Sequence, residues 1–452
     1  MRFLFTLWIS KLVRLIMRML GKNATYLPGV IAIKLCPEFL KHIGKPKIFI
    51  SVTGTNGKTT TANLISDVLE GTGHKVLSNR FGTNIAAGFA VSLMNGSTLF
   101  GRSKYDIGVF ETDERSVKQI YPFAPPTHIV ITNLFRDSIA RNAHPEYIAD
   151  FLTEAIPSKA LLILNADDPI SSRVAPNNPR VYFGIEKLPT DIVDCINLIN
   201  DLRICPKCNN KLEYEYRRYH HIGKFHCTDC SFHAPDYDYK AENINMDDMT
   251  MDIVDKSSQG SYKLLSDSIF NIYNMVTAIA LLRELGNSHT AIENQFEKSG
   301  IVSSRYDVVS AGNTKIIMQM AKQRNALAVS RAFDYISSQP GHKQILLMMN
   351  CQTDGKNWSE NPCWMYDCDF EFINKPEITR VVAAGYRYRD LYLRALFSGI
   401  PKDRLHCIRD EFDAVEAFDF SEKSSVYVLY GTDSYTLATK VRDKILERAK
   451  IK

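Results

Sequence analysis

Residues 50–69 read "ISVTGTNGKTTTANLISDVL", an apolar run followed by a glycine-rich turn and a helical pattern. Strand, turn and helix in this order place backbone N–H groups at a helix N-terminus, where they bind phosphate oxygens. The usual phosphate loop carries a glycine, four further residues and then Gly-Lys-Ser/Thr. Counting back from Gly57, Lys58 and Thr59, that first glycine would fall on Val52. The stretch therefore predicts an ATP- or GTP-binding loop of a shortened form.

Strand and helix patterns alternate on the C-terminal side of this loop. Strands alternating with helices predict a parallel sheet covered on both faces. Each strand ends on polar residues, at the edge where open α/β sheets bind ligands. We therefore predict an α/β nucleotide-binding domain over residues 46–310. The strand patterns lie at 106–112, 128–134 and 160–166, and the helical patterns at 144–156 and 271–285.

A second domain is expected after the polar segment "SAGNTK", residues 310–315. Three apolar runs beyond it have strand character, and each is followed by polar or helical sequence. Residues 311–452 are therefore predicted to form a second, Rossmann-like α/β domain. Its expected strands lie at 344–350, 378–387 and 425–432.

Length and composition indicate an intracellular globular enzyme. A chain of 452 residues exceeds what one hydrophobic core normally organises, so we expect two or three domains. A net charge of +5 is mild for this length and argues against a dedicated nucleic-acid-binding protein. Ten cysteines in so long a chain are not a secreted disulfide framework. We therefore expect a reducing, cytoplasmic location.

The first 45 residues form a separate lead-in that begins with a basic, apolar segment. Residues 1–20 contain four basic side chains, which fits neither a membrane span nor a secretory signal. On a helix Lys11, Arg14 and Arg18 share one face. Two interpretations stay open: the apolar face lies on an anionic membrane surface, or it packs on the protein itself. The residues of that face are Leu4, Trp8, Leu12, Leu15 and Met19.

Four cysteines have the spacing of a metal site. Cys205-x-x-Cys208 and Cys227-x-x-Cys230 are separated by eighteen residues, which is typical of a zinc ribbon. A redox pair is the alternative, although one Cys-x-x-Cys would suffice for it. We predict a four-cysteine zinc ribbon, inserted at about residues 200–235, that folds a segment with little core of its own. The nearby histidines are predicted to lie on the surface: His220, His221, His226 and His233.

The loop Gly-Thr-Asn-Gly-Lys-Thr-Thr resembles that of the Mur ligase superfamily. The resemblance implies a Mur ligase-like central P-loop ATPase domain, in which ATP phosphorylates an acceptor carboxylate and an amine attacks the acyl phosphate. Transfer of a phosphoryl group needs lysine and magnesium to neutralise charge. Four further segments carry the same resemblance: "ETDE" at 111–114, "TNLFRD" at 132–137, "LNADDP" at 164–169 and "NIYN" at 271–274.

The resemblance also implies roles for individual residues. Lys58 would hold the β- and γ-phosphates, Thr59 one Mg²⁺ and Glu111 a second, so that Lys58 and Glu111 are candidate catalytic residues. The residues expected to bind ATP in the loop are Gly54, Thr55, Asn56, Gly57, Lys58, Thr59 and Thr60.

Two further ATP contacts are implied outside the loop. Asn271 would contact the adenine side, and Arg305 would reach the phosphates. Asp113 and Glu114 follow Glu111 in the sequence and are second-tier candidates, because they fit a solvated face equally well.

Within the superfamily, a four-cysteine insertion resembles the MurT family, the synthetase subunits of lipid II isoglutaminyl synthase. The basic start before "LPG" at 27–29, the Asp354-Gly355 pair and "WMYDCDFEF" at 364–372 agree with it. The resemblance implies amidation of the α-carboxylate of D-glutamate in the lipid II stem peptide to D-isoglutamine. Ammonia would come from a GatD-like glutaminase in a heterodimer. Asp354 would complete that partner's Cys-His pair; alternatively, it only starts an Asp-Gly turn.

Two alternatives to this function remain. One is a diverged paralogue that joins an amine or amino acid to another carboxylate, since segments 303–307 and 320–330 depart from the family pattern. The other is a subunit that binds ATP without turning it over, which the intact set of Lys58, Thr59 and Glu111 argues against. The favoured interpretation places the protein in the cytoplasm, at the inner face of the membrane.

Overall fold

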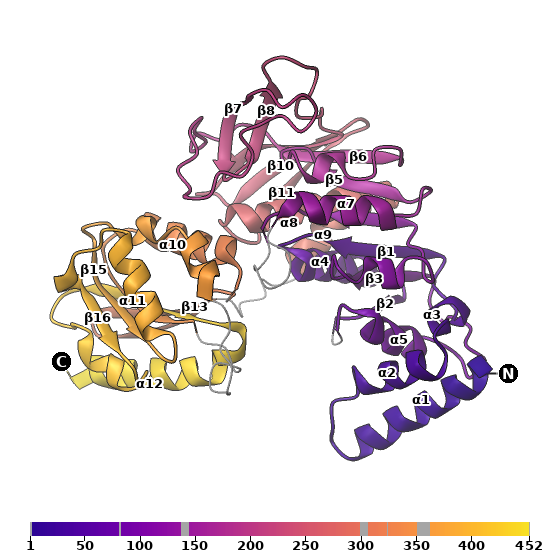
Figure 1. The fold of residues 1–452 in the computed structure, drawn as a ribbon, viewed down its shortest axis with the longest axis horizontal. Coiled ribbons are helices and arrows are strands. Elements are labelled where there is room, and N and C mark those ends of the chain that lie inside the picture. Colours follow the sequence, from indigo (N-terminus) through magenta and orange to yellow (C-terminus); the bar gives the residue numbers. More distant parts are fainter. Residues whose placement is uncertain are drawn as a thin grey trace. The chain divides into compact units, whose positions relative to one another are not determined.

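The chain forms two compact units (Figure 1). The computed structural model describes residues 2–80, 83–136, 144–298, 306–322, 324–349 and 362–451. The first unit comprises Met1–Phe135, His144–Ile196 and Asn200–Ile301. The second comprises Arg136–Ala143, Asn197–Ile199 and Val302–Lys452.

A nine-stranded sheet organises the first unit, in the order β11-β10-β9-β6-β5-β4-β1-β3-β2. The strands from β2 to β9 are parallel to their neighbours, and β10 and β11 extend the sheet in antiparallel fashion. The alternating pattern in the sequence predicted this parallel arrangement. The strands are β1 (Ile48–Thr53), β2 (Val76–Ser78), β3 (Ile107–Glu111), β4 (His128–Ile131), β5 (Leu161–Asn165), β6 (Arg180–Ile185), β9 (Tyr239–Asn245), β10 (Thr250–Asp255) and β11 (Gln259–Lys263).

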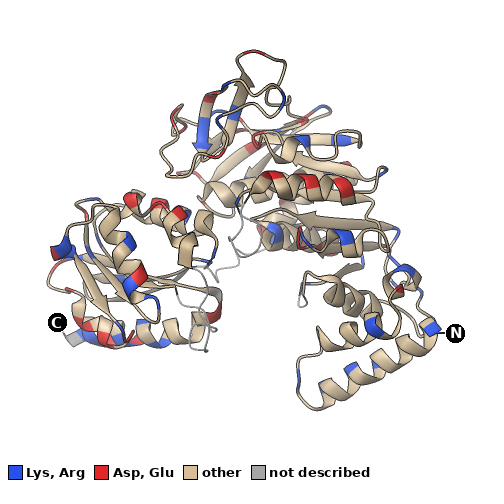
Figure 2. Ribbon diagram, viewed as in Figure 1, with Lys and Arg blue, Asp and Glu red and all other residues tan. Residues whose placement is uncertain are grey.

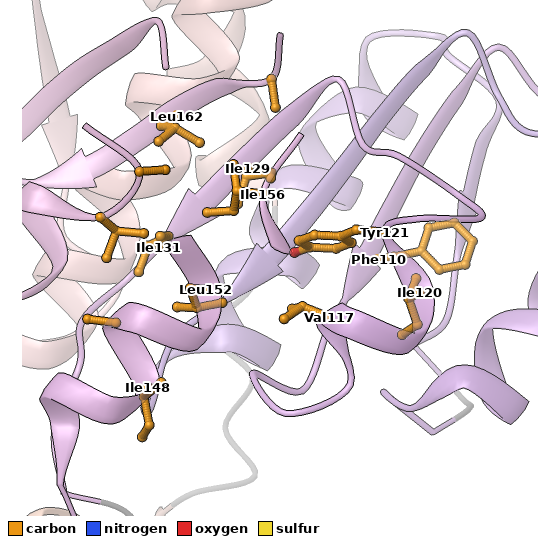
Figure 3. Packing of buried hydrophobic residues seen from close by; sticks show 14 of the residues in the cluster. Phe110, Val117, Ile120, Tyr121, Ile129, Ile131, Ile148, Leu152, Ile156 and Leu162 are labelled. Atoms are coloured by element: carbon orange, nitrogen blue, oxygen red, sulfur yellow. The ribbon is translucent and has the colours of Figure 1, made fainter. Parts of the chain in front are cut away.

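Helices cover both faces of this sheet, which explains why its central strands are continuous apolar runs. On one face α6 and α7 pack over β3, β4 and β5 (Figure 3). Ile148 and Leu152 lie one turn apart on α7 and belong to the same core as Ile131 of β4. The helices are α4 (Lys58–Gly71), α8 (Ile269–Glu284) and α9 (His289–Lys298) on one side, and α5 (Ala86–Asn95), α6 (Val117–Ile120) and α7 (Pro145–Ala155) on the other.

Three N-terminal helices belong to the first unit: α1 (Arg2–Met19), α2 (Leu27–Leu35) and α3 (Phe39–His42). Leu7 and Phe39 are buried in the same core as Phe49 of β1. Most of the predicted apolar face of α1 nevertheless points outward. Across the described helices, none combines the length and the apolar character that crossing a bilayer requires.

The second unit is built on a six-stranded sheet in the order β12-β13-β17-β14-β15-β16. Adjacent strands of this sheet are parallel, except that β12 pairs antiparallel with β13. Because β12 begins at Tyr306, the second unit starts before the predicted boundary at residue 311. Helices α10 and α11 cover one face and α12 the other. The elements are β12 (Tyr306–Ala311), β13 (Thr314–Met320), α10 (Ala326–Ser338), β14 (His342–Met348), β15 (Ile378–Ala384), α11 (Tyr388–Phe397), β16 (Leu405–Ile408), β17 (Ser424–Tyr430) and α12 (Tyr435–Ile451).

A separate two-stranded hairpin, β7 (Leu212–Tyr219) with β8 (Ile222–Cys227), lies within the cysteine-containing insertion. It follows β6 of the large sheet and precedes β9. Its aromatic side chains Tyr214 and Phe225 face each other and join the core of the first unit.

The packing of Phe110 gives a direct test of this core. Its fully buried ring lies 5.1 Å from the Phe49 ring and 4.9 Å from the Phe89 ring, measured between centroids. Phe110→Ala should lower the free energy of unfolding by about 3–5 kcal/mol, because it leaves a cavity. Phe100→Ala removes a ring that is 71% exposed and should change stability by about 0.5 kcal/mol at most. Urea unfolding of the two variants checks this, and equal losses would contradict the assigned core.

Candidate active site

The loop between β1 and α4 depends on two glycines with positive φ. Gly54 has φ 121° and Gly57 has φ 85°, a region that side-chain-bearing residues rarely adopt. A Cβ atom at Gly54 would lie 2.3 Å from Thr132 Oγ1, and one at Gly57 would lie 2.1 Å from Asn274 Oδ1. Both positions therefore require glycine, and the loop stays close to β4 and α8.

The segment after β4 holds the loop in place. Asn133 accepts the Thr55 N–H with its carbonyl (2.8 Å) and the Asn56 N–H with its side-chain oxygen (3.1 Å). The Thr132 hydroxyl donates to the Asn56 carbonyl at 2.6 Å. The Phe135 N–H donates to the Thr55 hydroxyl at 2.9 Å. The "TNLF" residues thus fix the loop backbone, a role that the sequence motif alone did not reveal.

Lys58, the first residue of α4, forms a buried ion pair with Glu114. Lys58 Nζ lies 2.8 Å from Glu114 Oε1, and both side chains are about one-tenth exposed. The same ammonium group donates to the carbonyls of Gly54 and Thr55. Burial disfavours the charged form of Lys58, but the Glu114 carboxylate outweighs that penalty, so the pKa of Lys58 lies above its ordinary value. Of the two alternatives left open for Glu114, the buried ion pair contradicts the solvated face.

Thr59 and Glu111, the predicted magnesium ligands, are in contact. The Thr59 hydroxyl donates to Glu111 Oε2 at 2.6 Å, and Asn84 Nδ2 donates to Glu111 Oε1 at 2.9 Å. Asn79 accepts the Glu111 N–H at 2.8 Å and so fixes the end of β3. Thr59 is exposed, which leaves the pair open to solvent. Hydroxyl and carboxylate oxygens at the end of a phosphate loop fit the ligand preferences of Mg²⁺.

The structure describes some of the remaining residues that were predicted to bind ATP or the partner subunit, and not others. Thr60 lies half-buried in the first turn of α4. Asn271 is half-buried in the first turn of α8, where its side-chain oxygen accepts from Asn274 at 3.5 Å. Asn274 of α8, which received no role from the sequence, lies directly beside Gly57 of the loop. Arg305 and Asp354 lie outside the described residues.

Two buried aspartates after β5, Asp167 and Asp168, join the loop's support to the hairpin insertion. Asp168 accepts the Leu134 N–H at 2.8 Å and lies 3.5 Å from His221 Nε2. Asp167 accepts the Tyr273 hydroxyl of α8 at 2.6 Å. Both aspartates are fully buried. The sequence placed them in "LNADDP" without a role; adjacent carboxylates at the carboxyl end of a buried strand were the available signal.

The hairpin supplies the positive charge that Asp167 requires. Arg218 Nη1 of β7 lies 3.3 Å from Asp167 Oδ2, and its Nη2 lies 2.8 Å from Asp191 Oδ2. Burial disfavours the charged guanidinium, but Tyr273, Asp167 and Asp191 together hold the pKa of Arg218 well above its ordinary value. The carboxylates are thus compensated rather than solvated.

Two of the four histidines in the insertion are buried, contrary to the prediction that they lie on the surface. His220 and His221 are 7% and 2% exposed at the tip of the hairpin. The His221 ring stacks on Phe135 with centroids 4.4 Å apart. The hairpin tip therefore packs on the segment that holds the phosphate loop. His226 and His233 are partly or fully exposed, as predicted.

The four predicted zinc ligands come together. The sulfur atoms of Cys205, Cys208, Cys227 and Cys230 all lie within 4.8 Å of one another. Sulfurs on a tetrahedral zinc would be separated by about 3.8 Å, given Zn–S bonds of about 2.3 Å. The pairs Cys205–Cys230 and Cys208–Cys227 are 3.6 and 3.4 Å apart. The N–H groups of Cys230 and Asp229 point at Cys227 Sγ and lower the pKa of that thiol. This donor set fits zinc.

The "WMYDCDFEF" segment lies in the core of the second unit. Trp364 and Phe370 are buried beneath α10 and α11, and Phe370 packs edge-on against Phe333 with centroids 4.8 Å apart. Arg394 of α11 holds both oxygens of Glu371 at 2.9 and 2.8 Å. These side chains therefore stabilise the fold of this unit.

Two families match separate parts of the chain. Residues 52–199 match the Mur ligase middle domain, and residues 323–436 match the MurT ligase C-terminal domain. The first match contains the phosphate loop, Glu111 and the paired aspartates. The second covers most of the second unit.

Solved structures with the same fold are also Mur ligases. A pseudomurein peptide ligase type C from Methanothermus fervidus superposes with a TM-score of 0.68 at 23% identity, covering 90% of this chain and 80% of that one. MurF ligase from Thermotoga maritima in complex with ADP gives a TM-score of 0.56 at 14% identity, covering 94% and 84%. These similarities confirm the predicted Mur ligase-like α/β fold.

Sequence relatives identify the family more closely. The lipid II isoglutaminyl synthase (glutamine-hydrolyzing) subunit MurT of Streptococcus pneumoniae (strain ATCC BAA-255 / R6) is 27% identical over 95% of this chain and 94% of its own length. The subunit of the same name from Staphylococcus aureus (strain COL) is 31% identical over 85% of this chain and 86% of its own length. Together with the two domain matches, these similarities show that the chain belongs to the MurT family of Mur ligase-type, ATP-dependent ligases.

Proposed function

We propose that the chain uses ATP to amidate the α-carboxylate of D-glutamate in the stem peptide of lipid II, giving D-isoglutamine through an acyl phosphate. The observation that carries the proposal is the assembled set of Lys58, Thr59 and Glu111 at the end of a glycine-dependent loop. The relatives named as MurT subunits of lipid II isoglutaminyl synthase support the acceptor, because they align with this chain over most of both lengths.

ATP, bound with Mg²⁺, supplies the phosphoryl group that turns a carboxylate into an electrophile. In this proposal the loop N–H groups and Lys58 would hold the phosphate oxygens, Thr59 would hold one Mg²⁺ and Glu111 a second. Lys58 is already charged and immobilised by Glu114. Because its position is set before nucleotide arrives, little reorganisation is needed when phosphate replaces part of its present contacts.

Ammonia is proposed to come from a separate GatD-like glutaminase subunit. The relatives' names describe subunits of a glutamine-hydrolysing synthase, which supports the existence of such a partner. Asp354 remains the residue proposed to complete the partner's Cys-His pair. A reaction between ATP and a lipid-linked precursor belongs in the cytoplasm, at the inner face of the membrane.

The cysteine cluster is proposed to bind a structural Zn²⁺. Four thiolates close the coordination sphere, which is typical of structural rather than catalytic zinc. The hairpin that carries Cys227 also carries Arg218 and His221, which contact Asp167 and Asp168. Zinc would therefore hold the base of the hairpin, and the tip of the same hairpin contacts the aspartates beside the proposed nucleotide site.

The reaction itself is tested with purified chain, Mg·ATP, ammonium chloride and lipid II. The product should be lighter than lipid II by the difference between a hydroxyl and an amino group, as read by mass spectrometry. Lys58→Ala should reduce turnover by at least about a hundredfold, because the loop loses the positive charge proposed to bind the phosphates. Lys75→Ala, which removes an exposed lysine beyond the end of α4, serves as the control. Normal turnover by Lys58→Ala would exclude the phosphate-loop assignment, and ATP turnover without amide would redirect the search to another acceptor.

Glu114→Gln tests the buried ion pair. Removing one charge of such a pair leaves the other uncompensated, so unfolding free energy should fall by about 3 kcal/mol. Saturating Mg·ATP should narrow this difference, because phosphate gives Lys58 a new partner. Urea unfolding with and without nucleotide measures both effects. Glu154→Gln breaks the surface pair with Lys118 and should cost about 1 kcal/mol or less. A Glu114→Gln protein as stable as the parent would show that the pair contributes nothing.

Cys205→Ser tests the zinc proposal. The variant should lose about one zinc per chain, and the insertion should become sensitive to proteolysis, because thiolate ligands and folding are coupled. Cys407→Ser alters an exposed cysteine outside the cluster and should retain the metal. Elemental analysis by mass spectrometry provides the measurement. The same metal content in both variants would refute the ribbon.

A further inference from the structure

Helix α1 presents an apolar face to the outside, and its buried side includes two polar residues. Thr6, Leu7 and Ser10 are at most 1% exposed and face the rest of the first unit. The outward residues recur at helical spacing and form one stripe. They are Phe5, Trp8, Leu12, Leu15, Ile16 and Met19, which are 46–79% exposed and are called here the outer face of α1.

Specific contacts hold α1 in this orientation. The Trp8 indole donates to the Leu99 carbonyl at 2.8 Å, and Lys11 Nζ donates to the Ser97 carbonyl at the same distance. Gly101, with φ 78°, lies so close to the Phe3 ring that a Cβ atom there would be 2.7 Å from it. The turn that receives α1 also exposes Phe100, which is 71% accessible and adds to the apolar surface. The helix is therefore docked, and its apolar stripe remains exposed.

The charge around this face has a single sign. Residues 1–37 contain six Lys and Arg and no Asp or Glu, whereas the rest of the chain carries 49 basic and 50 acidic side chains. The net positive charge of the protein is therefore concentrated in residues 1–37. Figure 2 shows that the charged residues of α1 are all basic. Burial and the neighbouring Lys104 and Arg14 lower the pKa of Lys11, as expected where like charges crowd together.

The positive charge beside the outer face of α1 also indicates which kind of partner, a second copy of this chain or a lipid bilayer, would bind there. A second copy of this chain would bring two sets of like charges against each other. An anionic bilayer offers both an apolar interior for the stripe and negative headgroups for its flanks. Helices with an apolar face and Lys or Arg beside it lie in the plane of such interfaces.

We propose that the outer face of α1 docks on an anionic lipid bilayer, with the helix parallel to the surface and its side chains Trp8, Leu12 and Leu15 among the acyl chains. Arg14 and Arg18 contact the headgroups. The proposal deepens the proposed function and rests on it in one respect, that the acceptor is carried by a membrane lipid. The contact would then confine the enzyme to the surface that holds its substrate.

Sedimentation of the full chain with vesicles tests this proposal. Vesicles of phosphatidylcholine with phosphatidylglycerol should bind the chain, phosphatidylcholine alone should bind it weakly, and salt should reduce the difference. Replacing Trp8, Leu12 and Leu15 together by Ser should weaken binding more than about tenfold. Phe397→Ser removes a ring that is 68% exposed in the second unit and should bind like the parent. Arg14→Glu with Arg18→Glu should abolish the preference for phosphatidylglycerol.

A second readout does not depend on the folding of the triple variant. Quenching of tryptophan fluorescence by brominated lipids should be strong in the parent and reduced in Trp8→Phe. Lack of vesicle binding by the parent, or unchanged binding by the folded triple variant, would overturn the proposal. A dimer seen by light scattering and lost in that variant would assign the face to a second copy.

The amidation assay with detergent-solubilised acceptor separates the two proposals. Normal amidation by a triple variant that no longer binds vesicles would support the bilayer contact and leave the function standing. If the parent chain binds vesicles but does not amidate the acceptor, the proposed function is contradicted and the proposed bilayer contact is retained.

Discussion

The fold of the first unit depends on two adjacent buried carboxylates, whose negative charge must be balanced by the surrounding residues. Asp167 and Asp168 follow β5 and are fully buried, so each needs hydrogen-bond donors or positive charge from its surroundings. Those donors come from the hairpin, from α8 and from the segment after β4. Segments distant in sequence must therefore converge on one point. The geometry of the proposed nucleotide site depends on that convergence, because the segment after β4 also holds the loop between β1 and α4.

Much of this architecture could be predicted because its signals are local. The glycine-rich turn between strand and helix specifies a phosphate loop by itself, and paired Cys-x-x-Cys spacing specifies a cluster of four sulfurs. The fold class and the family resemblance inferred from those segments are confirmed. Thr59 and Glu111, which the resemblance assigned to two Mg²⁺ ions, are in contact because β1 and β3 are neighbours in the sheet.

Other features depend on tertiary contacts that no single segment encodes. Glu114 is charged and follows a strand, yet it is buried because Lys58 approaches it from α4. His221 resembles a surface residue within a polar insertion, but the hairpin tip packs on Phe135. The pattern of α1 revealed its apolar stripe without revealing which side the protein would cover. Periodicity fixes which residues share a face, whereas the choice of the buried face depends on neighbours such as the Leu99 turn.

The close approach of Asn274 to the phosphate loop has a consequence for biosynthesis. Asn274 contacts Thr61 across 213 residues of sequence, and it also fills the space beside Gly57. A ribosome adding about 5–20 residues per second needs roughly 10–40 s to make that intervening chain. During that interval the loop lacks its contact with Asn274. The proposed phosphate site is therefore incomplete until α8 has left the exit tunnel. The proposed phosphate site is thus completed late in the synthesis of this protein.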